Sequence, residues 1–263
     1  MKSPIVTSRK KPSVTMRKSQ KAGSNKRMIP RSSLIFIFSL LTTGFILIGW
    51  ASVRMLTPRR PMYDLASDAK AYLRSRNVVP LAGSLEQLLD NPEKFRVASQ
   101  GHPLLNQLAP SFELPDHQEK PHRLSELTKS GPVVVMFYYG YWCNHCVGQL
   151  FALNDDFESF RKLGATVVAI SADPPEQTRE RFIEFGAFKF PVLSDKDSKI
   201  AEAFGVYEPA TAPEQGRLLH GTFLVDRGGR VRWCQFGDEP FTNNRALLIE
   251  LSKMEDRLAA NQK

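Results

Sequence analysis

The sequence predicts a three-layer α/β sandwich that follows a single transmembrane helix near the N-terminus. Three observations lead to this prediction. The 22 residues between Arg31 and Arg54 carry no charge. From about residue 101, short apolar runs of strand length alternate with segments of helical periodicity. A hairpin pattern and an amphipathic helix close the chain, and this order is typical of a sheet covered by helices on both faces.

The net charge is distributed unevenly along the chain. The formal charge of +9 comes from residues 1–31, which contain ten Lys and Arg residues and no acidic residue. The rest of the chain has 26 basic against 27 acidic residues. The predicted folded part therefore lacks the basic surface that nucleic-acid binding requires, and we expect no nucleic-acid partner. With 42% hydrophobic residues, the chain can build a globular core.

The uncharged segment has the length of a bilayer span. At 1.5 Å per residue it extends roughly 33 Å, against a hydrocarbon core of ~30 Å. The alternative is a secretory signal peptide, but its apolar core is typically only about 7–15 residues long. No clear A-x-A cleavage site follows this segment. We therefore expect an uncleaved transmembrane anchor at residues 32–54.

Flanking charge predicts how this anchor is oriented. The ten basic residues precede it, so the positive-inside rule keeps the basic tail, residues 1–31, in the cytoplasm. Everything from residue 55 onward is then expected outside the cytoplasm, in a bacterial periplasm or at the cell exterior. Residues 55–100 are interpreted as a tether with some helix, in which Ser84 and Gln87 fit a helix-capping box.

Residues 101–263 form the predicted domain. Apolar or alternating patterns predict strands at residues 111–116, 121–127, 132–139, 165–173 and 190–195, and a hairpin at 221–237 that turns at Gly228 and Gly229. Helical periodicity predicts helices from Cys143 to Gly164 and at residues 175–186, 198–206 and 243–258.

Two cysteines mark the candidate site, in the stretch YYGYWCNHCVGQL at residues 138–150. Cys143 and Cys146 are expected at the end of a central strand, in the first turn of the next helix. Free N–H groups and the positive end of the helix dipole stabilise a thiolate there. The alternatives are two inert buried thiols or half of a zinc site, but no second C-x-x-C or histidine pair follows. The pattern favours a redox pair that cycles between dithiol and disulfide.

The whole span 101–263 resembles the thioredoxin-like superfamily, and within it the redoxins of the alkyl hydroperoxide reductase and thiol-specific antioxidant group (AhpC/TSA), the relatives of peroxiredoxins. The stretches that carry the resemblance are LAPSFELPD, VVVMFYYGYWCNHCVGQL, VAISADPPE, FPVLSDKDSKIAEAFGV and GTFLVDRGGRVRW. It implies a thioredoxin-like α/β/α sandwich and a thiol oxidoreductase with antioxidant-type activity. The expected substrates are peroxides or protein disulfides, with a thiol electron donor and neither cofactor nor metal.

The resemblance also assigns roles to the cysteines. In thioredoxin-type chemistry, Cys143 is the exposed nucleophile and Cys146 resolves the mixed disulfide. In peroxidase chemistry, Cys146 attacks the peroxide and Cys143 condenses with its sulfenic acid. Cys143 stands where peroxiredoxins have a threonine. His220 stands where peroxiredoxins have an arginine and thioredoxins a cis-proline.

Three further residues, His145, His220 and Trp142, are candidates for supporting roles. His145, inside the motif, is expected to favour the thiolate. His220 is expected beside the dithiol as a hydrogen-bond partner or proton shuttle. Trp142 and its neighbours are interpreted as packing and partner-docking surface, and Cys234 as a buried thiol. The neighbours of Trp142 meant here are Tyr138, Tyr139 and Tyr141.

Two alternatives to a free-standing enzyme remain. Some membrane-tethered copper chaperones with a thioredoxin fold bind copper through a cysteine pair and a distant histidine, and Cys143, Cys146 and His220 could imitate that set. Those relatives typically have C-x-x-x-C, which is one residue longer. An electron relay within a complex, for instance in cytochrome maturation, would use the same dithiol with a different partner.

Overall fold

A five-stranded mixed sheet forms the centre of the structure, a computed structural model that describes residues 64–210 and 216–261. Its strand order is β5–β4–β3–β8–β9, with β3, β4 and β5 parallel and β8 and β9 antiparallel to their neighbours. The strands are β3 (Val133–Phe137), β4 (Thr166–Ser171), β5 (Val192–Ser194), β8 (His220–Val225) and β9 (Val231–Gly237).

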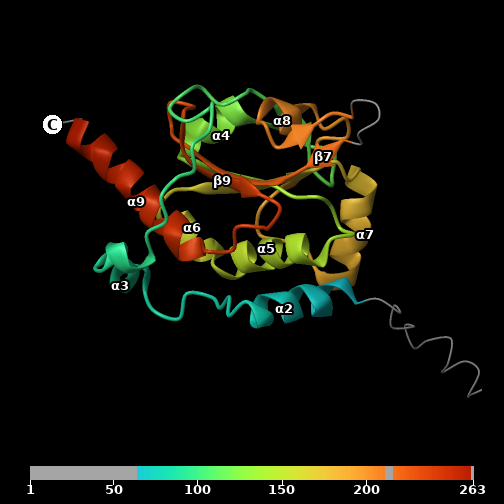
Figure 1. Ribbon diagram of the computed structural model, residues 1–263, viewed down its shortest axis with the longest axis horizontal. Coiled ribbons are helices and arrows are strands. Elements are labelled where there is room, and N and C mark those ends of the chain that lie inside the picture. The colour runs from blue at the N-terminus through green and yellow to red at the C-terminus, as the bar shows by residue number, and fades with distance from the viewer. Residues whose placement is uncertain (1–63, 211–215, 262–263) are drawn as a thin grey trace, which may run out of the picture. The chain divides into compact units, whose positions relative to one another are not determined.

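Helices cover both faces of this sheet, as Figure 1 shows. The central strand β3 is buried throughout, with Val134 and Met136 in one hydrophobic cluster and Val133 and Val135 in the other. Helices α4 (Leu124–Ser130) and α8 (Lys199–Ala203) lie on one side. Helices α5 (Asn144–Asp155), α6 (Phe157–Lys162) and α9 (Asn244–Asn261) lie on the other, and α7 (Pro175–Phe185) packs its phenylalanines into their cluster. The predicted three-layer sandwich is therefore confirmed.

Local differences from the predicted elements have physical causes. The short strands β1 (Glu113–Pro115) and β2 (Pro121–Arg123) form as expected. The remainder of predicted strand 121–127 is helix α4, because Leu124 and Thr128 share its buried face. The small antiparallel pair β6 (Tyr207–Glu208) and β7 (Arg217–Leu218) was not predicted. The hairpin turns at Gly228 and Gly229 as predicted, with Gly229 at φ +75°.

The helix predicted from Cys143 to Gly164 is broken at Asp156. Its carboxylate is buried, and it accepts hydrogen bonds from the backbone N–H of Leu81 at 2.7 Å and from the side-chain amide of Asn244 at 2.9 Å. These tertiary contacts hold a helix junction that local periodicity does not reveal.

The segment interpreted as a tether packs onto the domain over its described part. Helix α2 (Leu65–Ser75) buries Leu65, Ala69 and Leu73, and it lies against the outer side of α5 in Figure 1. Helix α3 (Leu85–Leu89) has the predicted capping box of Ser84 and Gln87, and the 3-10 helix η1 (Pro92–Phe95) follows it. The described helices of the predicted tether therefore belong to the same compact unit as residues 101–261.

A glycine allows the close approach of α2 and α5. A Cβ atom at Gly148 would lie 3.0 Å from Cδ1 of Tyr72 and 3.2 Å from the backbone oxygen of Ala69. We expect Gly148→Leu to lower the free energy of unfolding by about 1–3 kcal/mol, because the side chain must push α2 outward. Denaturant unfolding measures this effect. Gly101→Leu is the matched control, since nothing lies within 4 Å of a Cβ there, and equal losses in both variants would contradict the prediction.

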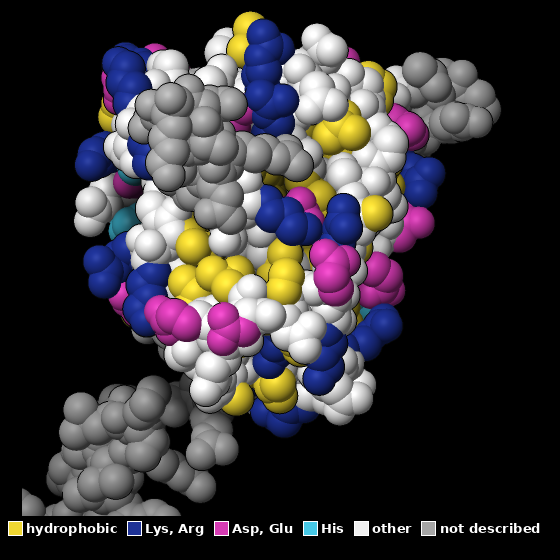
Figure 2. Space-filling model, turned by 90° about the vertical axis from the view of Figure 1, so that its left-hand side faces the viewer, with side chains coloured by type: hydrophobic (Ala, Val, Ile, Leu, Met, Phe, Trp, Pro, Cys, Tyr) yellow, Lys and Arg dark blue, Asp and Glu magenta, His cyan; other side chains and the backbone are white. Residues whose placement is uncertain are grey.

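The predicted basic tail and transmembrane anchor, residues 1–31 and 32–54, lie outside the described residues. Within the described part of the chain, no helix has both the length and the apolar character needed to cross a bilayer. Figure 2 shows the surface at the α3 and α9 end, where Lys and Arg side chains lie among Asp and Glu. This mixture agrees with the near balance of charge after Arg31.

Candidate redox site

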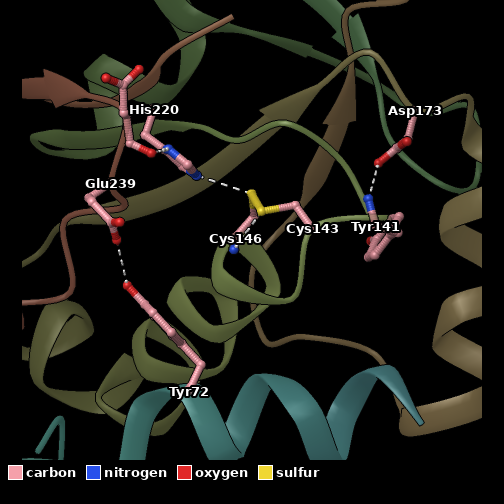
Figure 3. The surroundings of a disulfide bond; sticks show 8 residues. Tyr72, Tyr141, Cys143, Cys146, Asp173, His220 and Glu239 are labelled. Atoms are coloured by element: carbon pink, nitrogen blue, oxygen red, sulfur yellow. Dashed lines mark hydrogen bonds between the residues drawn. A yellow bond between two sulfur atoms is a disulfide. The ribbon is translucent and has the colours of Figure 1, made fainter. Parts of the chain in front are cut away.

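Cys143 and Cys146 form a disulfide at the start of α5, at the C-terminal end of the central strand β3 (Figure 3). Cys143 is the N-cap residue, and Cys146 lies in the first turn, with Cα atoms 5.4 Å apart. This distance is within the usual range for disulfides. The structure therefore brings the predicted pair together in the predicted strand–helix context.

The two sulfurs differ in exposure. Cys146 is completely buried, whereas Cys143 is partly exposed. The backbone N–H of Cys146 donates to Cys143 Sγ over 3.3 Å, so the sulfur of Cys143 occupies the capping position of the helix. A thiolate at Cys143 is stabilised there by the N–H group and by the helix dipole. Cys143, partly exposed and at the capping position, is thus the better placed of the two to attack an external electrophile.

His220, the first residue of β8, faces the buried sulfur. Its Nε2 lies 3.0 Å from Cys146 Sγ, and its Nδ1 lies 3.0 Å from the backbone oxygen of Asp238. A backbone carbonyl can only accept, so Nδ1 carries the proton and Nε2 presents a lone pair to the sulfur. Burial lowers the pKa of His220 to about 4. The imidazole is therefore a neutral base near pH 7, aimed at Cys146.

Asp173, just beyond the end of β4, holds the loop that leads into the cysteines. Its carboxylate accepts from the backbone N–H of Tyr141 at 3.0 Å and from the hydroxyl of Ser171 at 3.1 Å. Gly140 has a φ of +130°, and a Cβ there would lie 2.8 Å from Asp173 Oδ1. The carbonyl of Gly140 in turn accepts from the N–H of Cys143. Burial raises the pKa of Asp173.

A second buried polar contact ties α5 to the strand of His220. Gln149 donates to the hydroxyl of Thr222 at 3.0 Å and to the backbone oxygen of Phe241 at 2.8 Å. Gln149 is one helical turn beyond Cys146, and Thr222 is two residues beyond His220. This bridge therefore fixes the position of the helix on the strand next to the contact between Cys146 and His220.

Sequence reasoning did not identify Asp173 or Gln149. Asp173 could have been found because β3 and β4 are parallel, so the residues after their carboxyl ends lie at the same edge of the sheet. Gln149 is a polar residue within an apolar helical run, in phase with Cys146, and this is a weaker signal.

The other predicted residues surround the disulfide on the outside. His145 is exposed and stacks on Tyr72 of α2, with ring centroids 4.3 Å apart. Trp142 is 70% exposed and stacks on Tyr139, whose ring lies 4.1 Å from that of His220. The remaining aromatic residues of the motif, Tyr138 and Tyr141, are buried and pack in the core.

Cys234 lies on the opposite face of the sheet from the disulfide. It belongs to the hydrophobic cluster under α4 and α8, whereas Cys146 belongs to the cluster under α5. Its sulfur is 3.8 Å from the hydroxyl oxygen of Ser99, and burial raises the pKa of its thiol. This position agrees with the interpretation of Cys234 as a buried thiol.

The redox pair and His220 also have the chemistry of a soft metal site. Among the described residues, one ligand atom from each of Cys143, Cys146 and His220 lies within 4.8 Å of the other two. Thiolate and imidazole together suit copper(I) and zinc. The sulfurs are available to a metal only when the disulfide is reduced.

Comparison with known proteins identifies the relatives of this domain. A family model described as "AhpC/TSA family" matches residues 105–234. Peroxiredoxin Bcp of Escherichia coli is 30% identical over 150 residues, which are 56% of this chain and 93% of that protein. Thiol-disulfide oxidoreductase ResA of Geobacillus thermodenitrificans is 28% identical over 124 residues, 47% of this chain and 64% of that protein.

A solved structure gives the same result for the fold. The crystal structure of peroxidoxin BcpB from Mycobacterium tuberculosis has a TM-score of 0.51 and 27% identity, and the match covers 58% of this chain and 97% of that one.

These relatives confirm two predictions for the domain that they cover. Its fold is the thioredoxin-like α/β fold, and its chemistry is that of a thiol oxidoreductase, with the paired cysteines in place. The chain spans nearly the whole length of Bcp but only 64% of ResA, so substrates and partners do not transfer directly. On the match to the family model and to Bcp, the chain belongs to the AhpC/TSA family.

Proposed function

We propose that this protein reduces protein disulfides by thiol–disulfide exchange, with Cys143 as the attacking sulfur and Cys146 as the resolving sulfur. The observation that carries the proposal is the asymmetry of the pair. Cys143 is partly exposed and caps the helix, while Cys146 is buried against a neutral histidine base. Thiol–disulfide exchange needs one accessible thiolate and one protected thiol that reacts only after the first step.

The steps balance without a cofactor. The Cys143 thiolate attacks one sulfur of the substrate disulfide and releases the other as a thiolate, leaving a mixed disulfide. Cys146 then transfers its proton to Nε2 of His220 and attacks Cys143 Sγ. The second substrate sulfur leaves and takes up the proton, and the Cys143–Cys146 disulfide remains. Two electrons pass to the substrate. An external dithiol must then supply two electrons to reduce the Cys143–Cys146 disulfide again.

Peroxide reduction is the competing chemistry, since several relatives are named as peroxiredoxins. It requires Cys146 to reach the peroxide, and this sulfur has no exposed surface in the disulfide form. Cys143 is the more exposed residue of the pair, and it stands at the position where peroxiredoxins have a threonine. These two features favour a disulfide substrate.

The proposed location follows from the sequence. Residues 32–54, uncharged up to Val53, anchor the chain in the membrane with the basic tail in the cytoplasm, and the redox domain faces the outside. Outside the cytoplasm, disulfides form and persist, so substrates for the dithiol are available there. Protease treatment tests this location. A protease that reaches the outer compartment of cells with an intact inner membrane should cut the redox domain. Protection of the domain until the inner membrane is broken would contradict the proposed orientation.

A side-by-side substrate test decides between the two chemistries. The reduced full-length chain, in detergent, is mixed either with a protein carrying an accessible disulfide or with hydrogen peroxide. We expect the protein disulfide to oxidise the Cys143–Cys146 pair faster than hydrogen peroxide does. Alkylation of the remaining thiols and mass spectrometry measure the rate of this oxidation. Faster oxidation by hydrogen peroxide, with a sulfenic acid at Cys146, would contradict this proposal and indicate that the protein is a peroxidase.

Copper binding is the second candidate function, because the ligand atoms of Cys143, Cys146 and His220 converge. It predicts that the reduced chain binds one equivalent of Cu(I) and that His220→Ala weakens this binding. Competition with a chromogenic Cu(I) chelator measures it. Failure of the reduced chain to compete with the chelator would remove this candidate.

A further inference from the structure

The loop after β9 determines how His220 is held. The backbone oxygen of Asp238 accepts from Nδ1 of His220 at 3.0 Å, and this contact leaves Nε2 free to face Cys146. Any movement of the segment formed by Asp238 and Glu239 would move this carbonyl. The position of the base therefore depends on what holds these two residues.

Side chains from two distant elements hold this segment from opposite ends. Arg217 of β7 pairs with the carboxylate of Asp238 at 2.9 Å. On the other end, Oε2 of Glu239 accepts from the hydroxyl of Tyr72 at 3.3 Å and pairs with Arg76 at 3.2 Å. Tyr72 belongs to α2 and Arg76 is its C-cap residue, and α2 packs on the helix that carries the cysteines. Figure 3 shows Tyr72 reaching from α2 to Glu239, with His220 beyond it.

Tyr72 also contacts the cysteine motif itself. Its ring stacks on the imidazole of His145 with an interplanar angle of 21°. His145 lies between the two cysteines in the sequence. Gly148 allows this approach, because a Cβ there would crowd the Tyr72 ring at 3.0 Å. Tyr72 is therefore joined to both sides of the redox centre: to the motif through His145, and to the histidine base through Glu239 and the Asp238 carbonyl.

We propose that Tyr72 is a positioning residue of the redox site, which couples helix α2 to the dithiol by fixing Glu239 and stacking on His145. This inference rests on the proposed function for its biological meaning, but its geometry concerns only the pair and its surroundings. Helix α2 lies before residues 105–234, where the family model matches, and Glu239 lies after them.

The Glu239 carboxylate also acts on His220 electrostatically. Burial lowers the pKa of His220, and the Glu239 carboxylate opposes this shift, while His145 adds to it. Its other neighbours include the backbone of Gly237 and Asp238, the Cys146 sulfur and the Tyr139 ring. If Glu239 is released, the Asp238 carbonyl that holds His220 can move, and the contact of His220 with Cys146 loosens. The dithiol form, which His220 stabilises through the Cys146 thiol, then becomes less favourable relative to the disulfide.

The test measures the dithiol–disulfide equilibrium of the full-length chain in detergent against reduced and oxidised dithiothreitol. One dithiothreitol is oxidised for each Cys143–Cys146 disulfide reduced. We expect Tyr72→Phe and Glu239→Gln each to lower the equilibrium constant for reduction by about threefold, the scale of an exposed charged contact. Tyr72→Leu should lower it further, by roughly tenfold, because the stacking on His145 is lost as well.

Arg74→Ala is the matched control, because Arg74 is exposed on the same helix and its side chain forms no hydrogen bond or ion pair among the described residues. It should leave the equilibrium unchanged, and the unfolding temperature of Tyr72→Phe should stay close to that of the unchanged chain. The inference is overturned if Tyr72→Phe and Glu239→Gln both titrate like the unchanged chain, or if Arg74→Ala shifts as they do. Because dithiothreitol is the only partner, this result is independent of whether the chain reduces protein disulfides.

Discussion

Replacing Cys146 with serine should stop turnover and leave a protein that becomes trapped in a mixed disulfide through Cys143. The attack by Cys143 needs only its own thiolate, which the helix N-terminus stabilises. The release step needs the second sulfur, and serine cannot supply it. We expect the rate of disulfide reduction to fall by at least about a thousandfold, the scale seen when a reacting group is removed.

The measurement combines turnover with trapping. After incubation with a disulfide substrate, Cys146→Ser should give a covalent complex on a non-reducing gel, and Cys143→Ser should give none. Cys234→Ser is the control, since that thiol lies in the cluster on the other face of the sheet, and it should turn over normally. If Cys143→Ser trapped the substrate and Cys146→Ser did not, Cys146 would be the attacking sulfur.

Replacing His220 with glutamine should slow the resolving step by roughly a hundredfold, the scale of general-base catalysis. Glutamine fills similar space but cannot take the proton of Cys146. The attack of Cys143 should be almost unaffected, so the mixed disulfide should accumulate in stopped-flow and quench experiments. His122→Gln is the matched control, because that histidine contacts Asp116 in the β1–β2 pair and takes no part in the hydrogen bonds of the redox site. Equal effects of both substitutions would contradict a specific role for His220.

The same histidine gives a pH dependence with a definite sign. Burial holds the pKa of His220 at about 4, below the usual value of about 6.5 in an unfolded chain. Between these values the unfolded state binds more protons, so the stability of the fold rises with pH. The contribution, on the order of 2–3 kcal/mol, is complete above pH about 6.5 and is lost as the pH falls toward about 4.

Denaturant unfolding between these pH values measures this contribution. The unchanged chain should lose stability on acidification more steeply than His220→Gln does. The resolving step should also slow as the pH falls through about 4, where His220 becomes protonated and can no longer accept a proton. An identical pH slope in the two proteins would contradict a buried neutral histidine.

The sequence predicted what depends on local pattern. The apolar run of β3, the cysteines at the following helix start and the glycine turn of the hairpin are each encoded within a few residues. The capping box of Ser84 and Gln87 is another example, because both hydrogen bonds join residues three apart. Such features follow from hydrogen bonding and periodicity over one or two turns of chain.

The contacts that shape the site are of a different kind. Cys146 and His220 are 74 residues apart in the chain, and Tyr72 and Glu239 are 167 apart. The proximity of His220 to the dithiol could be expected only from the resemblance to thioredoxin-like proteins. The roles of Asp173, Gln149 and Tyr72 depend on strand order and on the packing of α2, which no local pattern reports.

By itself, the sequence determined the class of chemistry: a C-x-x-C pair at a strand–helix junction makes a stabilised thiolate wherever that junction forms. Only the tertiary structure decided which sulfur is buried, which nitrogen of His220 faces it, and that α2 reaches the site. The physical reason is that a thiolate is stabilised by its own helix. A base, its tautomer and its supports must instead come from strands and helices that meet only when the sheet is assembled.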